Sequence, residues 1–177
     1  MKQLLITIAA VVLVGCGESQ QTVPAPEAKP IARVAGAKAP DISIHEAAGK
    51  GNIAAVKQHL AAGTDVNAKD VIRSTALHAA AIVGNNEIAE LLIANAADVN
   101  AKDVTRMAPL HDAVVNGHKE IAKLLIAEGA SVNTRDSIGF TPLDLAFMKF
   151  KNLNEEMADL LRKHGGKTAE ELKAEGK

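Results

Sequence analysis

The sequence predicts an all-α fold, a solenoid of stacked helix–turn–helix units joined by hairpin-like loops. Two observations support this prediction. Short blocks of sequence recur at a constant spacing of 33 residues, and the chain of 177 residues is 47% hydrophobic but only 2% aromatic. A period of about 20 to 50 residues is typical of solenoids. Small apolar side chains favour closely packed helices, whereas strands favour β-branched and aromatic residues.

Composition also excludes a class of partner. The formal net charge is -1 at pH 7, whereas a general nucleic-acid binder needs clustered lysine and arginine. Tryptophan and tyrosine are absent, which argues against surfaces that stack on bases or sugars. We therefore expect no nucleic-acid partner.

The first 15 residues are organised like an export signal. Lys2 precedes an apolar run from Leu4 to Val14, and small residues follow it. As a helix, this run is too short to span a hydrocarbon layer of about 30 Å. A basic start, a short apolar run and small residues at its end are typical of a secretory signal peptide. We expect residues 1–15 to be removed.

The run ends in Leu13-Val14-Gly15-Cys16, which resembles the lipoprotein signal of bacteria. The resemblance implies that Cys16 becomes the first residue and carries lipid, so the lipid bilayer is a partner through acylated Cys16. Two or more acyl chains give stable anchoring. By the same resemblance, Gly17 in place of Asp favours the outer membrane of the bacterial cell envelope, facing the periplasm. The alternative is an ordinary signal peptide that contains Cys16 by chance.

Residues 16–40 are expected to form a disordered tether. Four prolines lie there among alanine, glutamate, lysine and glutamine, without apolar periodicity. Proline interrupts regular helix, and this composition cannot bury a core. The tether would hold a folded domain, residues 41–167, away from a membrane.

The 33-residue period is clearest in three sets of residues. Residues 65–70 read Asp-Val-Asn-Ala-Lys-Asp and recur identically as residues 98–103, while residues 131–136 retain the Val, the Asn and the final Asp. Residues 75–78, 108–111 and 141–144 read Thr-Ala-Leu-His, Ala-Pro-Leu-His and Thr-Pro-Leu-Asp. A further position is held by Gly51, Gly84 and Gly117.

These motifs resemble the ankyrin repeat, whose pattern contains Thr-Pro-Leu-His, a central Gly-His, a Leu-Leu helix, Gly-Ala and Val-Asn-Ala. The resemblance covers about residues 41–166, nearly all of the folded part, and implies an ankyrin-repeat solenoid. Four repeats fit, at about residues 41–69, 70–102, 103–135 and 136–166. Residues 168–177 would form a C-terminal capping helix or a tail, because Thr168 and Glu171 make a capping-box pattern.

Repeat three shows why each element should form. Pro109 suits a helix start, because the first N–H groups of a helix have no partner within it. Gly117 and Gly129 suit the ends of two successive helices. One helix pair is too small to bury its apolar face alone, so the repeats must stack. Apolar residues at helical spacing are Leu110, Ala113 and Val114 in the first helix, then Ile121, Leu124 and Leu125 in the second.

The terminal repeats depart from the pattern. In repeat one, Gln58 and His59 stand where repeat two has a pair of leucines, and we expect this polarity to face solvent. All three phenylalanines, Phe140, Phe147 and Phe150, belong to repeat four. We expect them to seal the C-terminal end of the core.

The sequence contains few candidates for chemistry. His78 and His111 are one repeat apart, and helices packed about 8–10 Å apart place them too far from each other for one metal ion. The resemblance implies a local hydrogen bond to the threonine of the motif. Asp70, Asp103 and Asp136 are expected to form turns, because ligands on successive repeats do not converge as a calcium site requires. We expect no enzyme activity, cofactor, metal or small-molecule substrate.

The resemblance implies that a protein partner binds at the loop tips and at the inner face of the first helices. Arg73 and Arg106 occupy tip positions where the family usually has glycine, which leaves the geometry of those tips open. The neighbouring aliphatic residues either form an exposed surface or fold back onto their own loops. The candidate tip residues are Val71, Ile72, Arg73, Ser74, Val104, Thr105, Arg106, Met107, Ile138 and Phe140. The candidate inner-face residues are Ile82, Val83, Val115 and Asn116.

The predicted function is a monomeric, membrane-anchored module that mediates protein–protein interaction in the bacterial cell envelope. One alternative is an inhibitor or immunity-type protein that blocks a specific periplasmic enzyme. Another is a structural accessory that stabilises an envelope complex.

Overall fold

The computed structural model describes residues 38–148 and 155–176. The predicted signal peptide, Cys16, most of the tether and Phe150 lie outside the described residues. Within these residues the chain forms nine α-helices and no strand. The prediction of an all-α fold is confirmed.

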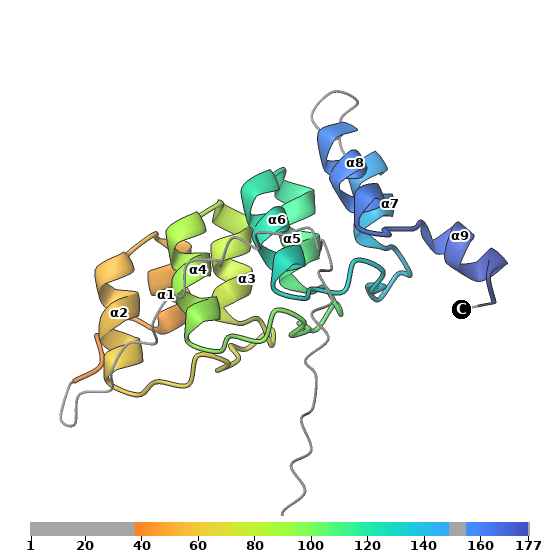
Figure 1. Ribbon diagram of the computed structural model, residues 1–177. Coiled ribbons are helices and arrows are strands. Elements are labelled where there is room, and N and C mark those ends of the chain that lie inside the picture. The colour runs from red at the N-terminus through yellow and green to blue at the C-terminus, as the bar shows by residue number, and fades with distance from the viewer. Residues whose placement is uncertain (1–37, 149–154, 177) are drawn as a thin grey trace, which may run out of the picture.

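Eight of the helices form four consecutive pairs, which are stacked in chain order (Figure 1). The first helices of the pairs, here called the inner helices, contact one another along the stack, α1 with α3, α3 with α5 and α5 with α7. The second helices of the pairs are called the outer helices. The short α9 follows the last pair and lies beside it. The bounds are α1 Ile44–Gly49, α2 Ile53–Ala61, α3 Ala76–Val83, α4 Asn86–Ala94, α5 Pro109–Asn116, α6 Lys119–Ala127, α7 Pro142–Met148, α8 Glu155–Lys163 and α9 Ala169–Ala174.

The turns within each pair follow from local chemistry. Gly84 and Gly117 end α3 and α5 with positive φ angles of 81° and 75°, a region that favours glycine. Asn52 and Asn85 begin α2 and α4, where each side-chain oxygen accepts a backbone N–H at 3.0 Å. His118 holds this position before α6, and its Nε2 instead bonds the Ile82 carbonyl at 3.1 Å. Pro109 is the first residue of α5, as predicted.

The core is a continuous stack of small and medium aliphatic side chains. Leu77, Leu110 and Leu143 occupy the same position in three successive repeats, and all three are fully buried. Ala80 and Ala113 are also fully buried between the first helices. An alanine at a helix contact lets the two axes approach closely, so the alanine-rich composition follows from the stacking.

A ladder of asparagines connects each loop to the next repeat. The Asn67 amide donates to the Ala96 carbonyl at 3.1 Å, and its oxygen accepts the Asp98 N–H at 2.7 Å. Each such pair of hydrogen bonds holds two repeats in the same register. The same two bonds recur from Asn100 to Gly129 and Ser131, and from Asn133 to Gly165 and Lys167.

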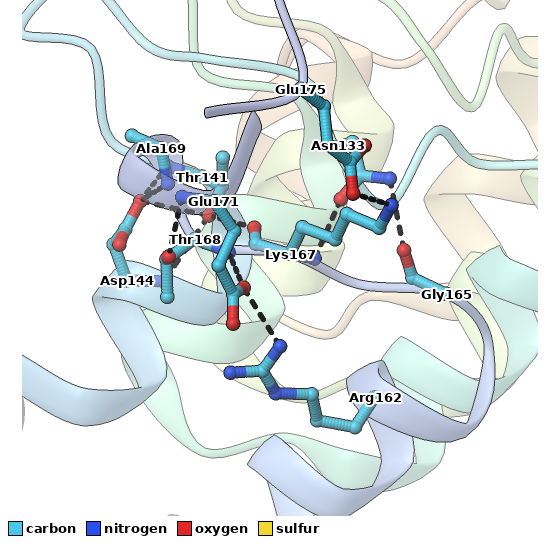
Figure 2. A network of polar contacts seen from close by, with 10 residues as sticks. All are labelled: Asn133, Thr141, Asp144, Arg162, Gly165, Lys167, Thr168, Ala169, Glu171 and Glu175. Atoms are coloured by element: carbon cyan, nitrogen blue, oxygen red, sulfur yellow. Dashed lines mark hydrogen bonds and ion pairs between the residues drawn. The ribbon is translucent and has the colours of Figure 1, made fainter. Parts of the chain in front are cut away.

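The asparagine ladder ends at α9 (Figure 2). Repeat four is three residues longer than repeat three, so the ladder position that follows Asn133 falls on Ala169. Alanine has no side-chain amide, so the ladder does not continue beyond this point. Asp144 stands where repeats two and three have a histidine. Its Oδ2 accepts the Ala169 N–H at 2.9 Å and the Thr141 N–H at 2.8 Å. A carboxylate is favourable at a helix N-terminus, so Asp144 helps to hold α9 against repeat four.

Salt bridges add to the docking of α9. Arg162 pairs with Glu171 at 2.7 Å, and Lys167 pairs with Glu175. Thr168 and Glu171 form the capping box at the start of α9. Leu172 is the buried residue of this helix.

Two predictions about the ends of the stack are wrong in part. In repeat one, Gln58 is exposed as expected, but His59 is not. His59 is buried, because both of its ring nitrogens have partners: Nε2 bonds the Ile42 carbonyl at 2.7 Å and Nδ1 bonds the Thr64 hydroxyl at 3.1 Å. Phe147 is 61% exposed and does not seal the core. Val114, which holds the same position in repeat three, is buried. Among the described residues, no further inner helix follows α7 to cover Phe147 in the same way.

We predict that Asn100→Ala lowers the free energy of unfolding by about 1–3 kcal/mol, since it removes two hydrogen bonds between repeats. The matched control is Asn116→Ala, because the Asn116 amide bonds only the Asp112 carbonyl within its own helix. Urea denaturation followed by circular dichroism measures both variants. Equal midpoints for the two would contradict the importance of the ladder.

Candidate functional site

The candidate surface begins with three hairpin loops that the aspartates build. In the first loop, Asp70 Oδ1 accepts the N–H of Ile72 at 3.0 Å and that of Ser74 at 2.8 Å, while the Asp70 N–H donates to the Ser74 carbonyl. Asp103 and Asp136 make the equivalent bonds in the next two loops. The aspartates therefore act as turn-forming residues, as predicted.

The two arginines at the tips keep the turn geometry that glycine would give. Arg73 and Arg106 have φ angles of 60° and 62°, while Gly139 at the third tip has a φ of 98°. The left-handed region costs a non-glycine residue about 1–2 kcal/mol. The hairpin hydrogen bonds hold the arginines there, and both side chains are exposed. The sequence left open whether arginine in place of glycine would change the tips, and the structure shows that both turns are intact.

Neighbouring tips are joined by backbone hydrogen bonds. The Val104 N–H donates to the Ile72 carbonyl at 2.9 Å, and the Ser137 N–H donates to the Thr105 carbonyl at 2.8 Å. The loops lie along one side of the stack in Figure 1. The three tips therefore form one connected row rather than separate flexible loops.

Most of the predicted tip residues are accessible. Val71 is 97% exposed and Ile138 is 78% exposed, while Ile72 and Val104 are about half exposed. The aliphatic side chains therefore do not fold back onto their loops. Thr105 is also exposed, Met107 and Phe140 are half-buried, and Ser74 is only 8% exposed. Ser74 is removed from the candidate surface, because its backbone closes the first hairpin and its side chain is covered.

The predicted inner-face residues lie at the ends of α3 and α5. Ile82 and Val83 are both exposed, Val115 is half-buried and Asn116 is exposed. Met148 on α7 lies 33 residues after Val115 and is also exposed. Sequence reasoning missed Met148, although the 33-residue register from Ile82 through Val115 points to it.

The two histidines of the motif link each inner helix to the following loop. His78 Nδ1 accepts the Thr75 N–H at 3.1 Å, so Nε2 carries the hydrogen that it donates to the Met107 carbonyl at 3.2 Å. His111 Nδ1 accepts the Ala108 N–H at 3.1 Å, and Nε2 donates to the Thr134 carbonyl at 3.0 Å. Burial lowers the pKa of both rings, although the carbonyl contacts oppose this shift. Both histidines are neutral structural links.

The described residues hold no group of three or more His, Cys, Asp or Glu side chains placed to bind a metal ion. Across the same part of the chain, no helix has the length and apolar character to cross a membrane. The arrangement offers a firm surface with exposed aliphatic and cationic side chains, which suits contact with another protein.

The lowered histidine pKa values predict a pH-dependent stability. An unfolded histidine binds protons below its ordinary pKa of 6.5, while buried His111 binds them only at lower pH. The stability that His111 contributes is therefore fully present above pH 6.5 and is lost as the pH falls below it. We expect the urea midpoint of the native protein to fall more between pH 7.5 and pH 5.5 than that of His111→Gln.

Asp112, whose pKa is raised to about 7, also titrates in this range and acts in the opposite direction. Both proteins retain Asp112, so the comparison between them isolates the histidine. An identical pH dependence in the two proteins would contradict the assignment of His111 as a buried neutral link.

Comparison with known proteins agrees with this geometry. A family model described as "Ankyrin repeats (3 copies)" matches residues 44–136, and no curated protein matches the chain. The matched segment is more than half of the chain and contains α1 to α6 with two of the hairpins. Ankyrin repeats indicate a module for protein–protein interaction, with a partner of unknown identity. The chain belongs to the ankyrin-repeat family.

Proposed function

We propose that this protein is a lipid-anchored ankyrin module of the bacterial cell envelope, which binds a protein partner through its hairpin tips and inner helices. The observation that carries the binding proposal is the connected row of tips, with exposed aliphatic side chains beside two exposed arginines. The protein acts by binding a partner and presenting it, and it catalyses no reaction. It does so as a monomer.

The tip row has three properties of a binding surface. Val71, Val104 and Ile138 present aliphatic side chains to solvent in successive repeats, and exposed apolar patches mark interaction sites. Arg73 and Arg106 add a residue type that is enriched at binding hot spots. The backbone bonds within and between the hairpins hold the row in place, which reduces the ordering cost of binding.

The anchoring proposal comes from the sequence alone. The Leu13-Val14-Gly15-Cys16 motif supports lipidation at Cys16. The proline-containing segment that follows supports a spacer between the lipid and the ankyrin domain. Gly17 supports the outer membrane, with the domain facing the periplasm.

We predict that Arg73→Ala combined with Arg106→Ala weakens the capture of the partner from detergent-solubilised membranes. Alanine already adopts the left-handed region in this chain, at Ala96 with a φ of 66°, so the tips should keep their shape. Affinity capture with the full-length chain, followed by mass spectrometry, measures the loss. One stoichiometric enzyme partner would favour an inhibitor or immunity-type role, and a multi-protein complex would favour a structural accessory.

The matched control is Lys57→Ala combined with Lys123→Ala. These substitutions also remove two exposed cations, but the lysines lie on the outer helices α2 and α6. Capture should survive in this control. If both double variants capture the partner as well as the native chain does, the tip arginines are not part of the binding surface.

We predict that Cys16→Ser prevents lipoprotein processing and releases the protein from the lipid-anchored fraction, because serine offers no thiol for lipid attachment. Membrane fractionation with a carbonate wash measures the partition. If the variant still stays with the washed membranes, the anchoring proposal is wrong.

A further inference from the structure

Asp112 lies on the inner face of α5, between apolar residues of the two neighbouring inner helices. Ala79 on α3 and Leu145 on α7 hold the same position one repeat before and one repeat after it, and both are half-buried. Helix α5 packs against α3 and α7. Asp112 itself is 9% exposed. A carboxyl group therefore stands at a position where both flanking repeats have aliphatic side chains.

Nothing in the described part of the chain pairs with the Asp112 carboxylate. No hydrogen bond or ion pair reaches it, and the Asn116 amide bonds the backbone carbonyl of Asp112 at 2.8 Å. Among the described side chains, every polar atom that is fully buried has a hydrogen-bond partner. The Asp112 carboxylate oxygens have none, so they are not fully buried. The carboxylate oxygens therefore open toward the surface and not into the core.

The electrostatics of this position are unfavourable in the chain alone. Burial raises the pKa of Asp112 to about 7, and the negative charge of Asp103 in the adjacent hairpin acts in the same direction. Burying a charge without a partner costs free energy. Other titratable groups on the packed helices already have partners of their own: His78 on α3, Lys119, Glu120 and Lys123 on α6, and Asp144 on α7.

A second row of side chains frames the carboxylate. Ile82, Val115 and Met148 follow Ala79, Asp112 and Leu145 by three residues each, which places them on the same face of their helices. Ile82 and Met148 are exposed, and Val115 is half-buried. The result is a small apolar surface with one acidic group near its centre.

We propose that Asp112 recognises a lysine or arginine side chain of the protein partner, and that the apolar side chains around it contact aliphatic residues on either side of that basic residue. The partner segment is thus apolar with a single cation. This proposal rests on the proposed function, because it assigns the chemistry of the inner part of the same binding surface.

The choice of a basic side chain follows from charge and ligand number. A lysine or arginine would donate charge-assisted hydrogen bonds to the carboxylate and offset the cost of its burial. A calcium ion requires about six to eight oxygen ligands. Asp112 supplies a single carboxylate, and the described residues hold no group of three or more His, Cys, Asp or Glu side chains placed to bind a metal ion.

The test uses a random-peptide display library as the probe, panned against the full-length chain in detergent at pH 8, where Asp112 is ionised. We expect enrichment of peptides with one lysine or arginine between aliphatic residues. These peptides should bind Asp112→Asn about ten-fold or more weakly, which is the range expected for one charge-assisted hydrogen bond. Panning against Asp112→Lys should instead enrich acidic residues at that position.

The matched control is Glu46→Gln, which removes a carboxylate from the equivalent position in repeat one. Glu46 is exposed and already pairs with Lys50 at 2.6 Å, so its loss should leave peptide binding unchanged. Asp112→Asn should be at least as resistant to urea as the native chain at pH 8, because it removes an unpaired buried charge. A loss of binding in that variant then cannot come from unfolding.

The outcomes separate this proposal from the one it rests on. Peptides that need Arg73 and Arg106, but show no basic residue and bind Asp112→Asn equally well, overturn the role of Asp112 and leave the binding surface standing. Basic peptides that bind Asp112→Asn with unchanged affinity also overturn it. If no selected peptide depends on the tips or on Asp112, both proposals fail.

Discussion

The structure depends on the stacking of helix pairs that cannot bury their own apolar faces. Stacking buries those faces only when neighbouring repeats share a register, and the asparagine ladder fixes this register at the loops. The histidine links fix it again beside the inner helices. Once the register is set, the hairpin tips meet at hydrogen-bonding distance and form the row on which the proposed function rests. The proposed binding surface is thus a product of the same contacts that hold the core together.

Sequence reasoning could predict the features that recur with the period. The helix pairs, the proline start of α5, the glycine ends and the turn-forming aspartates each follow from local chemistry, which is sufficient to place them. Features that depend on a particular neighbour at the end of the stack could not be predicted in this way. Phe147 is exposed because no described inner helix follows α7, and His59 is buried because the segment that precedes α1 supplies its carbonyl partner.

Asp112 illustrates a third case in the candidate site. The sequence shows it beside His111, where it resembles any other charge on a helix surface. Its burial becomes evident only in the structure, where Ala79 and Leu145 lie on either side of it. Their aliphatic side chains exclude the water that usually solvates an aspartate. Where the chain departs from the family pattern at the tips, the surrounding hydrogen bonds hold two arginines in a conformation that suits glycine. Asp112 and the two arginines all lie on the proposed binding surface.

The asparagine ladder suggests one way in which the domain could be lengthened. Each internal loop presents an asparagine side-chain amide to the repeat after it, and a backbone carbonyl and N–H to the repeat before it. A copy of a middle repeat inserted between two others would therefore find hydrogen-bond partners on both sides. At Ala169 the ladder ends, because alanine has no side-chain amide and its N–H donates to Asp144 instead. The length of the domain can therefore change in steps of one repeat, and each step would lengthen the row of tips.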